Sequence, residues 1–386
     1  MKRILIVTGG TGGHIFPALA LAEELSKKHK VRVFGDKNTQ KHLKNTLNLP
    51  FSKISSSQIP KNKLRKIFSA IKISIGILQS LVKITIYRPH FIFAFGGYST
   101  FPTLIAATLL RKKVILHEQN AVLGKVNRFM AKSVDAVALS FEDTKKVNWH
   151  QNKYTAVTGN PVRKEIVEIG DLYYPTLGDD RIFRILVIGG SQGAKIFSEV
   201  VPQAVSTLPR ASQRRLQITQ QCREEDIDAV RALYADTKIA VELTTFIEDL
   251  PTCLRWAHLV IGRAGASTIS ELTAAGRPGI LVPYPHATDD HQVFNAKEIV
   301  TNGGGWIYNN NEFNAKTLAK VLQKMARHPS EVWAAAEQAR KIGKPYAAND
   351  LADIVERLAL VRGDKRYIKV NDIKEEIENE GLRAER

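Results

Sequence analysis

Cysteine is scarce in this sequence, and no long apolar segment stands at its start. Only Cys222 and Cys253 occur among the 386 residues, and they have no CxxC spacing. So few cysteines exclude a disulfide-rich secreted domain and favour a reducing compartment. Four apolar residues, 4–7, precede the first glycines, whereas a signal peptide needs a longer apolar region. We therefore expect a cytoplasmic protein.

Acidic residues are missing from much of the first half, where none occurs between Asp36 and Glu118. Residues 1–160 carry 26 Lys and Arg against 7 Asp and Glu, whereas residues 161–386 carry 30 against 31. The net charge of +18 therefore comes from the first half, which predicts a polyanionic partner such as nucleic acid, anionic lipid or a phosphorylated substrate. A solvated, lysine-rich surface is the alternative, but it does not explain the asymmetry. Nucleic acid is not expected, because no recognition helix or aromatic-and-basic RNA signature occurs.

The order of apolar runs predicts the α/β class. A chain of 386 residues should divide into two or three domains. Short apolar runs alternate with helical patterns, which is typical of parallel sheets covered by helices. A helix is expected from Pro17 to His29, and residues 164–181 are the candidate linker. Strands are expected at residues 3–8, 31–35, 91–95, 113–117 and 134–139, and again at 182–188, 215–219, 239–243, 257–262 and 279–283.

One uncharged window, residues 91–110, is long enough to span a bilayer. Gly96, Gly97 and Pro102 in its middle predict a strand, a loop and a helix instead. A basic segment, residues 61–88, combines seven Lys and Arg with apolar residues at helical spacing and has no acid. This pattern predicts an amphipathic helix on an anionic membrane surface, and a core-facing helix with a solvated basic side is the alternative.

Two glycine loops follow predicted strands, at residues 8–13 and 189–194. Such loops let the backbone approach a ligand and aim N–H groups at an anion, although a tight turn without a ligand is the alternative. The first loop fits a dinucleotide fingerprint imperfectly, since Ile15 occupies the third glycine position. Asp36 could hold a ribose, so a dehydrogenase remains possible. No Walker lysine follows the second loop, which argues against a P-loop NTPase.

Two polar segments in the second half could bind a ligand. Glu271 could accept ribose hydroxyls or complete a capping box with Thr268. Gln292 can both donate to and accept from sugar hydroxyls. A metal site is conceivable in the same loop but lacks a recognised spacing, and its candidate ligands are His286, Asp289, Asp290 and His291.

Taken together, eight motifs occur in the order found in the MurG family, which this sequence resembles over about residues 1–358. This family transfers N-acetylglucosamine from UDP-GlcNAc in peptidoglycan synthesis and makes lipid II from lipid I. The motifs are TGGTGGHIFP (8–17), FGGYSTFP (95–102), HEQN (117–120), GNPVR (159–163), GGSQGA (189–194), FIEDL (246–250), RAGASTISEL (263–272) and VPYPHATDDHQ (282–292).

The resemblance implies the GT-B fold, two Rossmann-like domains facing across a cleft. Residues 1–163 would form the acceptor- and membrane-binding domain, and residues 164–344 the UDP-GlcNAc-binding domain. A C-terminal helix at about 345–361 would cross back to the first domain, and residues 362–386 form a charged tail without an assigned role. Loop 220–225 departs from the small, glycine-containing loop that the family often has there.

Roles for single residues are also implied by the resemblance. Arg163 and the backbone around Ile247 would hold the uracil, and Glu271 the ribose. Ser191 with its glycine loop would hold the diphosphate, and His14 is similar to the residue proposed as general base. The rest of the UDP-GlcNAc site would be Thr11, Gly12, Gly13, Asn120, Gln292 and Asn295. The acceptor diphosphate loop would be Gly96, Gly97, Tyr98 and Ser99.

The resemblance finally implies an inverting displacement at the donor's anomeric carbon. Backbone N–H groups at residues 190–194 would stabilise the leaving diphosphate, so we expect no cofactor and no obligatory metal. The expected partners are UDP-GlcNAc, lipid I, an anionic membrane surface and other cell-wall synthesis proteins. The expected location is peripheral, at the cytoplasmic face of the inner membrane. A sugar-nucleotide epimerase of the same fold is the remaining competitor.

Overall fold

The computed structural model describes residues 1–58, 60, 62–147, 154–175, 182–190 and 194–360. Contacts divide the chain into an N-terminal unit, Met1–Pro161 with the described residues from Tyr346 onward, and a C-terminal unit, Val162–Pro345. The divisions expected after residues 163 and 344 lie within two residues of these limits.

The N-terminal unit is built on a parallel sheet. Its strand order is β3-β2-β1-β4-β5-β6-β7. The central strands are buried on both faces, which their continuous apolar runs require. The direction of winding reverses between β1 and β4, so the loops after these two strands lie at the topological switch point. The strands are β1 Arg3–Val7, β2 Lys30–Gly35, β3 Phe51–Lys53, β4 Phe91–Ala94, β5 Lys113–Glu118, β6 Ala136–Leu139 and β7 Thr155–Val157.

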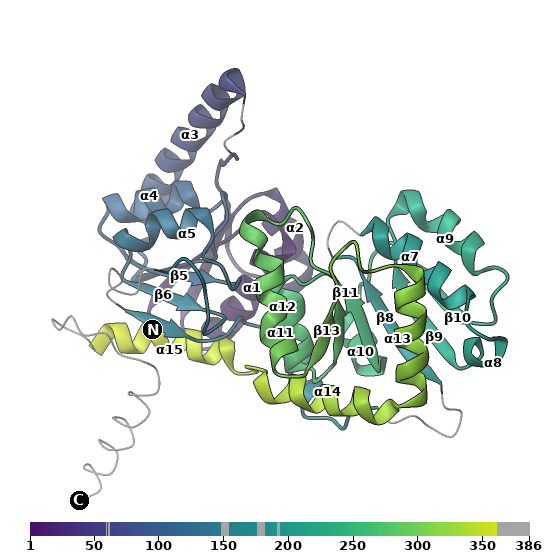
Figure 1. Cartoon of the computed structure of the whole chain (residues 1–386). Helices are drawn as coiled ribbons and strands as arrows, with labels where there is room; N and C mark the ends of the chain where they lie inside the picture. The colour runs from purple at the N-terminus through teal and green to yellow at the C-terminus, as the bar shows by residue number, and fades with distance from the viewer. Residues whose placement is uncertain (59, 61, 148–153, 176–181, 191–193, 361–386) are drawn as a thin grey trace, which may run out of the picture. The chain divides into compact units, whose positions relative to one another are not determined.

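Helices cover this sheet, including one from the far end of the chain (Figure 1). The C-terminal helix α15, Ala347–Leu360, packs on α1, Gly12–Ser26. Its apolar side chains enter the same core as those of β1, and Lys2 Nζ lies 2.9 Å from Glu356 Oε2. This confirms the expected return of the C-terminal helix to the first domain. The other helices are α2 Lys37–Thr46, α3 Lys63–Tyr87, α4 Phe101–Leu109 and α5 Lys125–Met130.

Helix α3 has an unusual distribution of side chains. It packs on α4, and Figure 1 shows its N-terminal part extending beyond that neighbour. Small polar residues face the unit: Ser69 and Ser80 are buried, and Ser80 Oγ lies 3.0 Å from Thr103 Oγ1. Large apolar side chains face outward, and Phe68 is 69% exposed. The exposed set is Ile67, Phe68, Ile71, Ile75, Leu78, Val82 and Ile86, which we call the apolar face of α3.

The C-terminal unit repeats the architecture with the strand order β10-β9-β8-β11-β12-β13, all parallel. Its switch point lies between β8 and β11. The strands are β8 Phe183–Ile188, β9 Leu216–Gln221, β10 Ala240–Thr244, β11 Leu259–Gly262, β12 Gly279–Leu281 and β13 Gly305–Ile307. The helices are α6 Lys164–Gly170, α7 Lys195–Ser206, α8 Arg210–Gln213, α9 Ile227–Tyr234, α10 Leu250–Trp256, α11 Ala266–Ala274, α12 His291–Thr301, α13 Ala315–Arg327 and α14 Pro329–Ile342.

The two parallel sheets confirm the predicted pair of Rossmann-like halves, with local corrections. Helix α1 begins at Gly12 rather than Pro17, because the glycine loop itself enters the first helical turn. Residues 164–170 form α6, whose Ile166 and Ile169 are buried against the unit, so this part of the candidate linker is structured. The uncharged window 91–110 is β4, a loop and α4, as predicted. Residues Arg65–Tyr87 of α3 have the length and composition of a membrane-crossing helix, although α3 is bound to its unit along one side.

Candidate functional site

The first candidate site lies at the switch point of the N-terminal unit. The first loop of this unit, residues 8–13, follows β1, and its second loop, residues 95–99, follows β4. Gly9 sits so close to the second loop that a Cβ atom there would lie 2.6 Å from Ser99 Cβ. Asp36, at the end of β2, bonds both loops: its Oδ2 accepts from Gly10 N at 2.6 Å and from Ser99 Oγ at 2.9 Å. Its Oδ1 accepts from Thr39 N at 3.0 Å and so caps α2. Asp36 therefore fixes the two loops to each other, and its oxygens are engaged rather than open to a ribose.

His14 lies in the first turn of α1, half-buried beside the second loop. A Cβ built on Gly97 would lie 3.7 Å from His14 Cε1 and Nε2, and Gly97 has φ +77°. Thr11 Oγ1 lies 3.5 Å from His14 Nδ1, which ties the ring to its own loop. The fully buried His117 lies within electrostatic range, and its burial lowers the pKa of its own ring to about 4. His117 is therefore neutral at neutral pH and His14 has no cationic imidazolium beside it there.

The HEQN segment is organised around Glu118, a buried carboxylate at the end of β5. Glu118 Oε1 accepts from the backbone N of Asn120 at 3.0 Å and from Asn120 Nδ2 at 3.1 Å. Glu118 Oε2 accepts from Gly124 N at 2.8 Å and from Asn127 Nδ2 at 2.9 Å. Burial raises the pKa of Glu118, and these donors partly offset the rise. Gly124 and Asn127 hold the Glu118 side chain, and Glu118 in turn fixes the position of Asn120, which the sequence predicts as a ligand of UDP-GlcNAc.

The HEQN segment is also bonded to the loop after β4, residues 95–99. Gln119 Nε2 donates to the carbonyl oxygen of Phe95 at 3.0 Å. Asn127 lies against Gly96, where a Cβ atom would be 3.0 Å from Asn127 Nδ2. Three loops at the carboxyl ends of β1, β4 and β5 thus form one hydrogen-bonded assembly. Ser99 is buried in it and bonded to Asp36, so within the predicted acceptor loop its hydroxyl serves the assembly.

The second candidate site lies in the C-terminal unit and pairs two residues that the sequence predicts as ligands of UDP-GlcNAc. Arg163 Nη2 lies 3.1 Å from Glu271 Oε1. Burial raises the pKa of Glu271, and the Arg163 guanidinium opposes the rise. Arg163 also lowers the pKa of Asp249, the N-cap of α10, although the bonds from Thr252 contribute more. Asp249 lies two residues after Ile247, so the segment predicted to bind the base lies within electrostatic range of Arg163.

The alternative role of Glu271 as a capping residue is wrong. Helix α11 begins with Gly265 as its N-cap, and no side chain caps it. Thr268 lies inside the helix, so the expected Thr268-x-x-Glu271 box does not form. Glu271 therefore has Arg163 as its partner in place of the helix end.

A side chain of β9 bonds the glycine loop that follows β8, residues 189–194, to a neighbouring segment. Gln221, the last residue of β9, accepts from Gly189 N at 3.2 Å and donates to the carbonyl oxygen of Thr245 at 3.3 Å. It links the start of the glycine loop to the segment that contains Ile247. Gly190 is described, whereas Ser191, Gln192 and Gly193 lie outside the described residues.

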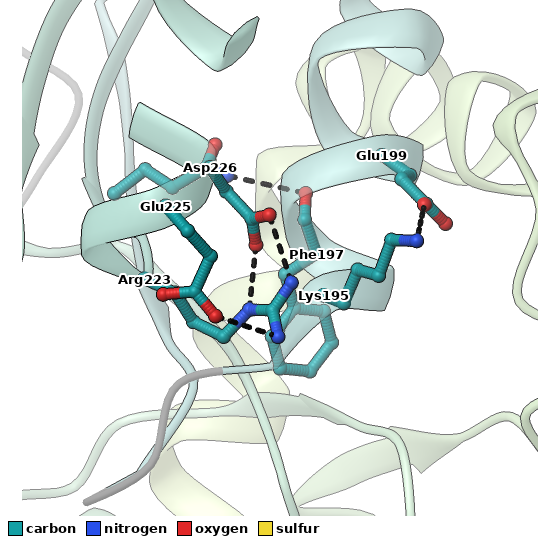
Figure 2. A network of polar contacts seen from close by, with 7 residues as sticks. Lys195, Phe197, Glu199, Arg223, Glu225 and Asp226 are labelled. Carbon is teal, nitrogen blue, oxygen red and sulfur yellow. Dashed lines mark hydrogen bonds and ion pairs between the residues drawn. The ribbon is translucent and has the colours of Figure 1, made fainter. Parts of the chain in front are cut away.

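The unusual loop 220–225 carries a compact charge network. Figure 2 shows Arg223 between Glu225 and Asp226, next to the first turns of α7. Arg223 Nε lies 2.7 Å from Asp226 Oδ2, and Arg223 Nη1 lies 3.0 Å from Glu225 Oε1. The bonds from Arg223 lower the pKa of Asp226, so this carboxylate stays ionised. The single guanidinium therefore offsets part of the negative charge of Glu225 and Asp226, close to where an anionic diphosphate is expected.

The remaining predicted ligands lie along the start of α12. Gln292 Oε1 accepts from Tyr284 N at 2.9 Å, which orients the loop after β12. Asn295 is fully buried and its Nδ2 donates to the carbonyl oxygen of Ala264 at 3.1 Å. Asn295 therefore supports the loop after β11. Among the described residues, no group of three or more His, Cys, Asp or Glu has the geometry to hold a metal ion.

Two domain models match this chain and decide its family. The glycosyltransferase family 28 N-terminal domain matches residues 4–139, and the family's C-terminal domain matches residues 184–358. The chain belongs to glycosyltransferase family 28. A family 28 relative from Zymomonas mobilis is 45% identical over 363 residues, which are 92% of each chain. That relative is named UDP-N-acetylglucosamine–N-acetylmuramyl-(pentapeptide) pyrophosphoryl-undecaprenol N-acetylglucosamine transferase.

Solved structures agree with the family assignment. The crystal structure of Acinetobacter baumannii MurG is 29% identical, with a TM-score of 0.73 over 92% of this chain and all of that one. UDP-GlcNAc 2-epimerase from Neisseria meningitidis gives a TM-score of 0.64 over 92% and 99% of the two chains. At 14% identity, that likeness concerns the fold alone. The MurG resemblance expected from the eight motifs is confirmed.

Proposed function

We propose that this chain transfers N-acetylglucosamine from UDP-GlcNAc to the C4 hydroxyl of N-acetylmuramic acid in undecaprenyl-diphosphate-MurNAc-pentapeptide. The product is lipid II, used for peptidoglycan synthesis. The observation that carries this proposal is the match, over 92% of both chains, to a transferase of this printed activity. The glycine-rich sequences at both switch points support it, because a glycine loop after a strand can aim backbone N–H groups at an anionic ligand.

In this proposal the C-terminal unit binds most of the donor. Arg163 and the backbone at Ile247 hold the uracil, and the Glu271 carboxylate accepts the ribose hydroxyls. The loop 189–194 with Ser191 holds the diphosphate. Gly190 in this loop has φ +75°, a backbone conformation that favours glycine. The remaining donor ligands are Thr11, Gly12, Gly13, Asn120, Gln292 and Asn295.

The chemistry is a single displacement with inversion at the anomeric carbon. The C4 hydroxyl attacks, its proton goes to a base, and UDP leaves from a transition state with oxocarbenium character. His14 is the proposed base, because an imidazole can accept a proton near neutral pH. Backbone N–H groups at the start of α7 stabilise the charge that grows on the diphosphate. The acceptor's own diphosphate lies at Gly96, Gly97 and Tyr98, with Ser99 holding that loop to Asp36.

The acceptor's lipid requires the enzyme to work at a membrane surface. We propose that the apolar face of α3 enters the headgroup boundary, peripherally, at the cytoplasmic face of the inner membrane. The exposure of Phe68 and Ile86, 69% and 73%, supports this role, since large apolar side chains are seldom left in water together on one helix. Arg65 and Lys66, exposed on the same helix, would contact anionic lipid. Other cell-wall synthesis proteins would be partners at the same membrane surface.

The decisive experiment incubates the purified chain with radiolabelled UDP-GlcNAc and a lipid I analogue, with and without EDTA. Label should pass into the lipid fraction and persist in EDTA. Donor incubated alone tests the competing epimerase, since an epimerase would convert UDP-GlcNAc without any lipid. Failure to label the acceptor would reject the transferase, whereas loss of labelling in EDTA would reject only the metal-free mechanism.

A further inference from the structure

A cavity of about 620 Å³ opens in the N-terminal unit, away from both glycine loops. It lies where β1 begins and α3 ends, at the amino-terminal ends of the strands. The glycine loops lie at the opposite, carboxyl-terminal ends of the strands. Three arginines dominate its lining, and the full set is Arg3, Arg32, Thr85, Ile86, Tyr87 and Arg88. We call this the arginine pocket.

Neighbouring backbone and aromatic groups hold two of the three arginines in place. Arg3 Nε donates to the carbonyl oxygen of Arg88 at 2.9 Å. The Arg32 guanidinium lies 4.8 Å from the centroid of the Tyr87 ring. Tyr87 is itself fixed, because its hydroxyl donates to the carbonyl oxygen of Lys30 at 2.8 Å. The cationic groups of Arg3 and Arg32 are therefore ordered before any ligand arrives, which lowers the entropy lost on binding.

The pocket is positively charged without internal compensation. No acid occurs among residues 37–117, which include α3 and the turn to β4. Within the described part of the chain, the ion pairs found do not include Arg3, Arg32 or Arg88. Arg32 Nε is buried and has no hydrogen-bond partner. Among the described residues this buried donor has no acceptor, which is costly, and an acceptor bound beside it would relieve that cost.

We propose that the arginine pocket binds a phosphate group. Guanidinium groups bind phosphate oxygens through paired N–H donors, and three of them suit a dianion. Two sources share this chemistry, a phospholipid headgroup and a soluble phosphate compound. Ile86 on the pocket wall and Val82 one turn earlier are 73% and 59% exposed, so an acyl chain could continue along the apolar face of α3. This site does not depend on the proposed transferase activity.

The test is calorimetric titration of the full-length chain with inorganic phosphate and with a short-chain phosphatidic acid below its micelle concentration. Ionic strength is held constant, so that general screening does not imitate binding. Wild type should bind both probes saturably. Arg32→Gln and Arg88→Gln should each weaken binding at least tenfold. Arg88→Gln keeps the backbone carbonyl that accepts from Arg3. Because the Arg88 side chain is exposed, this substitution should leave the fold intact, so weaker phosphate binding would not be due to misfolding.

Arg111→Gln is the matched control, since Arg111 is also an exposed arginine with positive φ at a helix end of the same unit. It should bind both probes like wild type. Tighter binding of the phosphatidic acid than of inorganic phosphate assigns the pocket to a lipid headgroup, and equal binding assigns it to a soluble phosphate. Phosphate binding that is absent in wild type, or that survives unchanged in both pocket variants, overturns the proposal.

Discussion

Arg163 lies 3.1 Å from Glu271 through its Nη2 atom, although 108 positions separate them in the chain. This pairing has a consequence for pH. Burial raises the pKa of Glu271 and Arg163 counteracts the rise, so the loss of Arg163 should raise the pKa further. If the ionised carboxylate holds the ribose, donor binding should weaken as pH falls through this pKa.

In Arg163→Gln, we therefore expect the acid limb of the donor KM profile to move to higher pH. Arg163→Lys should restore part of the wild-type profile, because it returns the positive charge without the forked donors. Glu271→Gln should remove this limb. The measurement is the UDP-GlcNAc KM across the acid range, and an unshifted limb in Arg163→Gln would contradict the electrostatic role.

Asp36 should be required for acceptor use through the two loops that it joins. Asp36→Asn removes the charge that accepts from Gly10 N and Ser99 Oγ. A hydrogen bond to a charged group contributes about 1.5–3 kcal/mol, so we expect kcat/KM for the acceptor to fall about 10- to 100-fold. Ser99→Ala removes one of these bonds and should have the smaller effect. Wild-type kcat/KM for the acceptor in Asp36→Asn would show that Asp36 does not act by joining the loops.

Glu118 should not be replaceable by its amide. In Glu118→Gln one oxygen becomes an NH₂ group that faces two of the four donors, so we expect unfolding to become easier by about 2–4 kcal/mol. Loss of donor affinity should accompany this through Asn120. Urea unfolding and donor KM would be measured together.

The pH dependence of stability distinguishes this role further. The pKa of Glu118 is raised in the folded protein, so its contribution to stability falls as pH rises from the unfolded value through the folded one. Glu118→Gln should lack this fall. A glutamine variant with wild-type stability at every pH would show that the four donors do not depend on the carboxylate.

His14→Ala should reduce kcat by about 100-fold or more while changing the donor KM little, because a general base acts mainly in the transition state. The rise of kcat with pH that an imidazole produces should also disappear. Steady-state rates with the lipid I analogue across neutral pH make the measurement. A near-normal kcat would remove His14 from this role.

Membrane binding should depend on the apolar face of α3. Phe68→Ser with Ile71→Ser should weaken binding to vesicles that contain phosphatidylglycerol by about tenfold or more, since burying such side chains contributes about 1.5–3 kcal/mol each. Arg65→Glu with Lys66→Glu should weaken it most at low salt. Leu233→Ser, on an exposed leucine of the C-terminal unit, is the control and should bind normally. Unchanged sedimentation of the α3 variants would return this helix to a purely structural role.

The sequence was sufficient for the architecture because strong signals were local. Glycine loops after apolar runs located both switch points, and helical spacing located α3. The strands β3, β7 and β13 were missed, since three residues at a sheet edge give too short a pattern to recognise.

The supporting residues of the site were harder to predict. Asp36 was considered only as a ribose ligand, although an acid just before a helix also signals an N-cap. Gln119 and Gln221 act through backbone groups of distant segments, and no local pattern reveals such partners. Glu118 and Asn127 bond each other across nine residues, which the sequence pattern does not reveal either. The sequence of loop 220–225 shows its departure from the family, but not the ion pairs of Arg223 with Glu225 and Asp226.

The position of α15 bears on how the polypeptide matures. Leu351, Ile354 and Val355 complete an interior that Ile4 and Ile6 begin. During synthesis, the residues of α15 that complete this core therefore leave the ribosome only after the whole C-terminal unit has been made. Until then the core of the N-terminal unit lacks these three side chains. A truncation before residue 351 leaves that part of the core exposed to solvent.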